Sequence, residues 1–125
     1  MRHVLLVDDS PVMRRYVART LEMIGMEITV HEAGNGKDAM SKAFEIRPDL
    51  IITDLNMPEM SGGELLAAVG RTAELRGTPM IVMSADRSAE RPDQMILAGA
   101  MAYLTKPVTP ESLRRCLVSI LEEKG

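Results

Sequence analysis

The sequence predicts an α/β fold in which a five-stranded parallel sheet is covered by helices on both faces. Short runs rich in valine, isoleucine and leucine alternate with segments whose apolar residues recur every three or four positions, and five such pairs follow one another. The 125 residues are 46% hydrophobic and 26% charged, a balance that supports one apolar core without disulfides. We therefore expect a single doubly wound domain over residues 1–125, without a separate output domain.

The first strand is predicted at His3–Val7 and is followed by a helix. Ser10 is suited to be the N-cap of that helix, and Pro11 stands at the first helical position, where its missing N–H would have no helical partner. Gly25 provides a C-cap. The apolar face that should pack on the sheet comprises Met13, Tyr16, Val17, Thr20, Leu21 and Ile24.

The second strand is expected around Ile28–Glu32, and the Gly34–Gly36 turn leads from it into a helix that ends before Pro48. One side of this helix is apolar and carries Ala39, Met40, Ala43 and Phe44. The third strand, Leu50–Thr53, has the short apolar character of a central parallel strand that is covered on both faces. It delivers Asp54 at its carboxyl end.

The remaining elements follow the same alternation. A helix near Gly63–Arg71 precedes a strand at Pro79–Ser84. A looser helix is expected within Ser88–Gly99, and a fifth strand at Met101–Leu104. Thr109–Pro110 repeats the signal of a cap followed by a proline. The helix that begins there has an apolar face made of Leu113, Cys116, Leu117, Ile120 and Leu121.

Composition limits the partners and the compartment. The net charge is −3 without a Lys/Arg block, and aromatic residues make up only 2%, so the chain lacks both a phosphate-tracking stripe and a base-stacking platform. The single cysteine, Cys116, excludes an internal disulfide and suits a reducing cytoplasm. No apolar run approaches the ~18 residues of a membrane span. We expect a monomeric cytoplasmic protein whose partners are proteins, not nucleic acids or membranes.

Polar residues that carry chemistry follow four of the five predicted strands. Asp8 and Asp9 come directly after the first strand, and Asp54 comes after the third. Ser84 ends the fourth strand, and Lys106 stands two residues beyond the fifth. Ligands of open parallel sheets bind beyond the carboxyl ends of the strands. These side chains are therefore expected to converge on one edge of the sheet.

Three carboxylates held close together repel one another unless a cation neutralises them. Mg²⁺ prefers oxygen ligands and commonly combines one or two carboxylates with waters and a phosphate oxygen, so it fits this cluster better than zinc. His3 and His31 lie elsewhere and fit structural or solvated positions. With the ion and Lys106 neutralising charge, Asp54 can attack a phosphoryl group, and Ser84 can donate one further hydrogen bond.

These residues resemble the bacterial response-regulator receiver domains, in particular the stand-alone chemotaxis type. The resemblance spans nearly the whole chain and rests on the acidic pair in LLVDDS, on Asp54 within DLIITDLNMPEMSG, on Ser84–Ala85 and on the tyrosine and lysine of AMAYLTKP. It implies the flavodoxin-like strand order 2-1-3-4-5. It also implies a two-component signalling switch that is phosphorylated on Asp54 by a histidine kinase. Such a switch catalyses its own phosphorylation and dephosphorylation but is not a conventional enzyme.

The resemblance further implies roles for individual residues in the pocket. Asp9, Asp54 and the main-chain carbonyl of Asn56 would ligate Mg²⁺, or Mn²⁺ in its place. Asp8 would act mostly through a coordinated water. Lys106–Pro107 looks like the family's usual cis peptide, which a proline permits at a cost of about 0.5–1 kcal/mol and which would aim the lysine into the pocket.

Ser84 and Tyr103 are implied as the switch. Ser84 would follow the phosphoryl group inward and Tyr103 would change rotamer with it, reshaping the face formed by the fourth helix, the fifth strand and the fifth helix. That face would recruit a target such as a flagellar motor switch or a histidine phosphotransfer protein. Ser84 stands where a threonine is frequent in the family, and Asp86 adds negative charge near the pocket mouth. Tyr103 fits simple packing as well as it fits a mobile switch.

Other functions fit the sequence less well or share its anatomy. A flavin carrier would need a phosphate-cradling loop after the first strand, where this chain has two aspartates. A haloacid-dehalogenase-like phosphatase would carry an Asp-x-Asp pair in place of the adjacent pair. A phosphorylation-independent pseudo-receiver would lack pocket residues, and none is lost here. A phosphorelay shuttle that passes phosphate to a histidine phosphotransfer protein has the same anatomy and stays open beside chemotaxis signalling.

Overall fold

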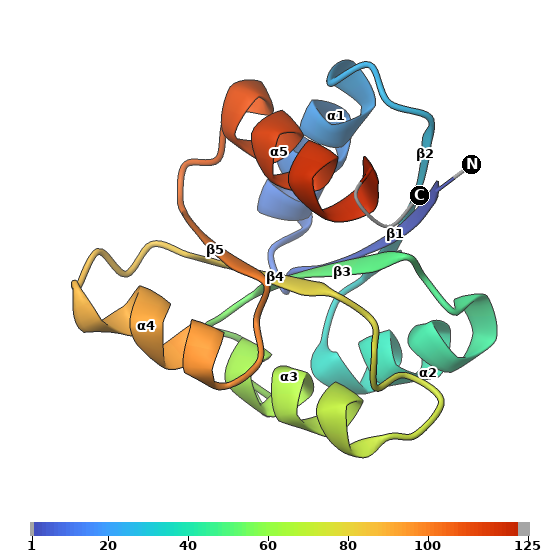
Figure 1. The fold of residues 1–125 in the computed structure, drawn as a ribbon, viewed down its shortest axis with the longest axis vertical. Helices are drawn as coiled ribbons and strands as arrows, with labels where there is room; N and C mark the ends of the chain where they lie inside the picture. The colour runs from blue at the N-terminus through green and yellow to red at the C-terminus, as the bar shows by residue number, and fades with distance from the viewer. Residues whose placement is uncertain (1, 123–125) are drawn as a thin grey trace.

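Five parallel strands form one sheet in the order β2-β1-β3-β4-β5 (Figure 1). The computed structural model describes residues 2–122, so residues 1 and 123–125 of the expected domain lie outside the described part. The strands are β1 (Arg2–Val7), β2 (Ile28–Ala33), β3 (Leu50–Asp54), β4 (Met80–Ser84) and β5 (Ala102–Thr105). The expected α/β class and the strand order implied by the resemblance are confirmed.

Helices cover both faces of the sheet (Figure 1). On one face lie α1 (Pro11–Met23) and α5 (Pro110–Leu117). On the other lie α2 (Gly36–Ile46), α3 (Gly62–Arg71) and α4 (Glu90–Leu97). Each parallel connection passes through a helix, which is why the central strands β3 and β4 are buried along their whole length. Within residues 2–122, no helix is both long enough and apolar enough to cross a bilayer.

Two apolar layers hold the helices on the sheet. Successive residues of a strand point to opposite faces, so Leu5 packs toward α2, α3 and α4 while Leu6 packs toward α1 and α5. Methionines fill both layers, with Met80 in the first and Met83 in the second. All four side chains are at most 1% exposed. The core is therefore aliphatic and methionine-filled, in keeping with the eleven methionines and the 2% aromatic content of the sequence.

Helix starts follow the capping signals of the sequence, with one exception. The Ser10 hydroxyl accepts a hydrogen bond from the Met13 N–H at 3.3 Å, and Thr109 forms a capping box with Ser112. The N-cap position of α4 is occupied by Ala89, which offers no side-chain acceptor. The helix that the sequence placed only loosely, within Ser88–Gly99, thus begins without a side-chain cap. A side-chain N-cap contributes about 0.5–2 kcal/mol to a helix that has one.

Some details differ from the expectation. The observed ends of the helices and strands differ from the predicted ends by about one residue, which is within the usual uncertainty of assigning element ends. The π-helical segment Val118–Glu122 continues α5, so the last element is not one regular α-helix. Tyr16 and Phe44 are expected on buried faces, yet they remain 44% and 41% exposed. Tyr16 donates its hydroxyl hydrogen to the Val108 carbonyl at 3.0 Å, so its ring spans from α1 to the segment before α5 and stays partly exposed.

The two histidines and the cysteine occupy packing positions. His3 and His31 stack across β1 and β2 with the ring nitrogens Nδ1 and Nε2 3.0 Å apart. Cys116 packs against the apolar layer of α1 and α5, and burial raises the pKa of its thiol. Among residues 2–122, none of the three belongs to a group that could hold a metal ion.

Gly62 lets the start of α3 approach the end of β3. Its N–H donates a hydrogen bond to the Leu55 carbonyl at 2.7 Å. A Cβ atom at this position would lie 2.3 Å from the carbonyl oxygen of Asp54 and 2.9 Å from Cα of Leu55. Because both neighbours are backbone atoms, they cannot rotate out of the way. The missing side chain therefore closes the loop between β3 and α3 tightly behind Asp54.

Gly62→Ala should destabilise the fold by about 1–3 kcal/mol, because the added methyl group must displace backbone. The matched control is Gly63→Ala in the same helix, where the nearest neighbour of a Cβ atom is the Ser61 hydroxyl at 3.7 Å. Alanine is the better helix former, so the control should be neutral or slightly stabilising. Urea unfolding followed by circular dichroism measures both. Equal stability of the two variants would contradict the close approach.

Candidate functional site

The sheet brings the predicted site residues to one edge. The last paired residues of β1 and β3 stand opposite each other, so Asp8 and Asp54 leave the sheet at the same level on neighbouring strands. On the other side of β4, the Lys106 N–H donates a hydrogen bond to the Ser84 carbonyl at 2.8 Å. The convergence expected from the strand ends is therefore present in the fold.

Three carboxylates form the centre of the site. One oxygen each from Asp8, Asp9 and Asp54 can be chosen so that all lie within 4.8 Å of one another. Asp8 is completely buried and Asp54 is 7% exposed, whereas Asp9 is exposed. The cluster thus has a buried floor and a solvent-facing mouth.

Lys106 reaches into this cluster from the end of β5. Its Nζ lies 3.3 Å from Oδ1 of Asp54 and 3.5 Å from Oδ2 of Asp8, with the lysine side chain 16% exposed. The peptide bond between Lys106 and Pro107 is cis, as the resemblance implies. One ammonium therefore bridges the two buried carboxylates.

The charge of the cluster is incompletely compensated. Burial raises the pKa of Asp54 above its ordinary value of 3.8, and the neighbouring charges of Asp8 and Asp9 raise the pKa further. Lys106 opposes these effects through its charge and its hydrogen bond, yet the net direction remains upward. Ionised Asp54 therefore has too little positive charge nearby to offset its burial and its two acidic neighbours.

The donor set suits a hard divalent cation. Oδ1 of Asp8 accepts a hydrogen bond from the Ser10 N–H at 3.0 Å, whereas Oδ2 is buried and accepts none within the described residues. A buried oxygen without a hydrogen-bond donor is unfavourable unless a cation approaches it, and Lys106 is 3.5 Å away. Asn56 lies exposed in the loop after Asp54, where its carbonyl is expected as a further ligand. Oxygen ligands of this kind match Mg²⁺.

Ser84 and Tyr103 both form hydrogen bonds with the main chain of Asp86. Ser84 is completely buried at the end of β4, and its hydroxyl accepts a hydrogen bond from the Asp86 N–H at 3.0 Å. Tyr103 on β5 donates its hydroxyl hydrogen to the Asp86 carbonyl at 2.9 Å. The ring packs against the apolar layer of α2, α3 and α4. The two residues that the resemblance implies as a switch are thus joined through Asp86.

The side chain of Asp86 ties this loop to α4. Its carboxylate accepts hydrogen bonds from the Ser88 N–H at 2.9 Å and from Nε of Arg91 at 3.0 Å. The Ser88 hydrogen bonds and then the Arg91 contact hold the pKa of Asp86 below its ordinary value. The negative charge expected near the pocket mouth is therefore paired with Arg91, a partner that the sequence alone does not suggest.

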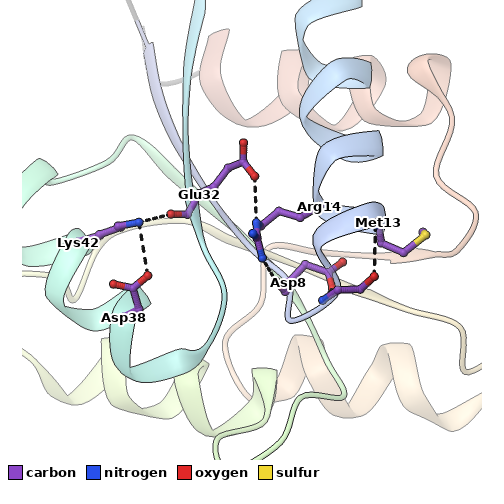
Figure 2. A network of polar contacts seen from close by, with 7 residues as sticks. Asp8, Met13, Arg14, Glu32, Asp38 and Lys42 are labelled. Carbon is purple, nitrogen blue, oxygen red and sulfur yellow. Dashed lines mark hydrogen bonds and ion pairs between the residues drawn. The ribbon is translucent and has the colours of Figure 1, made fainter.

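Arg14, like Arg91, makes contacts near the site that the sequence does not single out. Its guanidinium donates one hydrogen bond to the Asp8 carbonyl at 2.7 Å and another to the Glu32 carboxylate at 2.9 Å (Figure 2). A signal was present, since Arg14 stands in the first turns of the helix that begins just after the acidic pair. Only the fold, however, brings Glu32 of β2 within reach.

Comparison with known proteins agrees with this geometry. A model of the response regulator receiver domain family matches residues 4–118. The two-component response regulator ARR15 of Arabidopsis thaliana is 33% identical over 122 residues. That match covers 90% of this chain but only 59% of the plant protein, so this chain spans about three fifths of that relative's length.

Solved structures of similar proteins match nearly the whole chain. The chemotaxis protein CheY4 of Vibrio cholerae is 37% identical with a TM-score of 0.87, and the match covers 97% of this chain and 99% of that one. The signal receiver domain of a histidine kinase from Syntrophus aciditrophicus is 28% identical with a TM-score of 0.86, covering 98% and 92% of the two chains. Together with the family match and the acidic cluster, these likenesses establish that the chain belongs to the response regulator receiver domain family.

Proposed function

We propose that this receiver is a phosphorylation switch that takes a phosphoryl group from a histidine kinase onto Asp54 in a Mg²⁺-dependent reaction. The observation that carries the proposal is the position of Asp54. It lies at the carboxyl edge of the sheet beside Asp8 and Asp9, with the Lys106 ammonium 3.3 Å from its carboxylate. Phosphoryl transfer depends mainly on positioning and charge neutralisation, and these groups supply both.

Asp9, Asp54 and the Asn56 carbonyl would hold the ion, with Asp8 acting through a coordinated water. The bound ion would neutralise charge on the transferring phosphoryl oxygens. A carboxylate oxygen of Asp54 forms the new bond to phosphorus, while the phosphorus–nitrogen bond of the phosphohistidine donor breaks and its electron pair returns to the imidazole. Lys106, whose ammonium lies 3.3 Å from Oδ1 of Asp54, would pair with the phosphoryl oxygens once the Asp54 carboxylate is esterified.

Ser84 and Tyr103 would carry the phosphorylation state to the surface. The Ser84 hydroxyl is the donor proposed for a phosphoryl oxygen. If it turns toward the phosphoryl group, its hydrogen bond from the Asp86 N–H changes, and the carbonyl of that same residue holds Tyr103. Tyr103 lies on β5 beside α4, so the α4-β5-α5 face would change with it and recruit a target protein.

The pathway follows from likeness and is the finer part of the proposal. Similarity to a Vibrio cholerae protein described as a chemotaxis response regulator supports chemotaxis or motility signalling. In that role the chain would act as a single receiver domain, monomeric and cytoplasmic, on a target such as a flagellar motor switch. A phosphorelay shuttle is the second candidate, and similarity to plant two-component regulators is compatible with it. Mixing phosphorylated protein with a histidine phosphotransfer protein separates them, because a shuttle loses its phosphoryl group to that protein whereas a motor regulator keeps it.

Phosphorylation is tested by intact mass after incubation with acetyl phosphate. The wild-type chain should gain one labile phosphoryl adduct with Mg²⁺ and none with EDTA, and Asp54→Asn should gain none. Asp93→Asn is the matched control, because it removes an equal charge from an exposed position on α4. Failure of the wild type under conditions that label a known receiver would favour a phosphorylation-independent pseudo-receiver.

The raised pKa of Asp54 predicts how its charge affects stability. The folded state binds this proton more tightly than the unfolded state, so stability is lost as the pH rises from 3.8 through the raised pKa. Without divalent ions, Asp54→Asn should therefore raise the free energy of unfolding at neutral pH and change it little at pH 3. Urea unfolding at both pH values measures this. A variant less stable than wild type at neutral pH would contradict the uncompensated charge.

Magnesium should reverse that order. An ion that binds only the folded wild type adds about 2.7 kcal/mol at a concentration 100 times its dissociation constant. Asp54→Asn has lost one carboxylate ligand and should gain much less. Thermal unfolding with MgCl₂ or with KCl of matched ionic strength distinguishes binding from screening. An equal shift in both proteins would argue against a site that includes Asp54.

A further inference from the structure

Arg14 joins the acidic loop to the edge strand of the sheet. It projects from α1, and its Nη1 donates to the carbonyl of Asp8 at 2.7 Å while its Nε donates to Glu32 of β2 at 2.9 Å (Figure 2). A planar guanidinium offers donors in fixed directions, so two simultaneous hydrogen bonds define its position. The arginine therefore holds the main chain of Asp8 at a set place relative to β2.

The partner of Arg14 is itself held from the other side. The Glu32 carbonyl accepts a hydrogen bond from the Lys42 ammonium of α2, and Lys42 also pairs with Asp38 at 3.4 Å (Figure 2). The guanidinium also lies against the turn after β2, where a Cβ atom on Gly34 would be at contact distance, 3.4 Å, from Nη1 of Arg14. The chain of contacts runs from α2 through β2 to the loop that carries the acidic pair.

The contact with the Asp8 carbonyl is more specific than the ion pair. Side chains of Arg14 and Glu32 are 21% and 45% exposed, and ion pairs of such exposure contribute little to stability. The hydrogen bond to the carbonyl instead restrains a residue whose carboxylate is completely buried in the cluster. The Glu32 carboxylate also offsets a positive charge that would otherwise stand unpaired near a cation site.

We propose that Arg14 is a positioning residue for divalent-ion binding, because it holds the main chain of Asp8 and thereby the carboxylates of Asp8 and Asp9. The inference rests on the proposed metal-dependent function and extends it to a residue outside the acidic cluster. Removing a group that hydrogen-bonds to a metal ligand and orients it commonly weakens metal binding by about 10–100-fold. For a contact to the main chain of a ligand residue, we expect the lower end of this range.

The test counts free Mn²⁺ by electron paramagnetic resonance while each protein is titrated with the ion. Arg14→Met should bind Mn²⁺ about 10-fold more weakly than wild type. Arg15→Met is the matched control: it removes the same charge from the next residue of α1, which is exposed. The control should bind within about twofold of wild type, so the comparison separates the hydrogen bond from the general loss of positive charge.

A second pair of variants keeps the charge constant. Arg14→Lys cannot hold the carbonyl and the carboxylate with one planar fork and should bind Mn²⁺ more weakly than Arg15→Lys does. Circular dichroism confirms folding, and if Arg14→Met does not fold, the lysine pair decides. The acetyl phosphate reaction gives a further readout, because saturating Mg²⁺ should restore the Arg14→Met rate while half-saturation moves to higher concentration.

The outcomes separate the two proposals. Arg14 variants that bind Mn²⁺ as tightly as their Arg15 counterparts would overturn the positioning role and leave the metal-dependent switch intact. A wild-type chain that binds no Mn²⁺ and accepts no phosphoryl group would overturn both. Weaker binding confined to the Arg14 variants, with the reaction restored by excess Mg²⁺, supports the role of Arg14.

Discussion

Repulsion among the three carboxylates is the constraint on which the site depends. Asp8 and Asp54 are buried, so the solvent that would screen an exposed acidic pair is largely excluded, and among residues 2–122 only Lys106 bridges them. The raised pKa of Asp54 and the buried Asp8 oxygen without a hydrogen-bond donor are two signs of the same deficit of positive charge. A divalent ion and a phosphoryl group change that deficit in opposite directions. Such a cluster is therefore sensitive to both.

The fold holds these charges together by securing each strand in an apolar environment. β3 is buried along its length and receives apolar cover on both faces, so the position of Asp54 is set by packing that does not involve the site. Gly62 further restricts the position of Asp54, because it lets the start of α3 pack against the main chain of Asp54 and Leu55. Free energy from the core thus offsets the unfavourable electrostatics at the sheet edge. Weakening the packing behind Asp54 would change the geometry of the cluster as well as stability.

Periodicity, helix caps and strand ends are local features of the sequence, and they account for the parts of the fold and site that could be predicted. Strands and helices each have their own periodicity and caps, and residues at strand ends must meet at one edge, so the acidic cluster and Lys106 are predictable from linear order. The strand order was implied by resemblance and not by periodicity. Arg14 and Glu32 are eighteen positions apart and meet only because α1 packs beside β2. Gly62 is equally hidden, because its necessity depends on the distance between two backbones.

The two sides of the pocket are secured differently, and this difference bears on the proposed switch. On the side of the acidic pair, Arg14 connects the loop to β2, whose position is defined by hydrogen bonds along the sheet. On the side of Ser84, Asp86 connects the loop to Arg91 of α4, a helix of eight residues without a side-chain N-cap. Moving the first loop would disturb strand pairing, whereas moving the second would shift the start of α4, which has no side-chain N-cap, and the Tyr103 hydroxyl that donates to the Asp86 carbonyl. The loop of the acidic pair is therefore held more firmly than the Asp86 loop, an asymmetry that the switch proposed at Ser84 and Tyr103 would use.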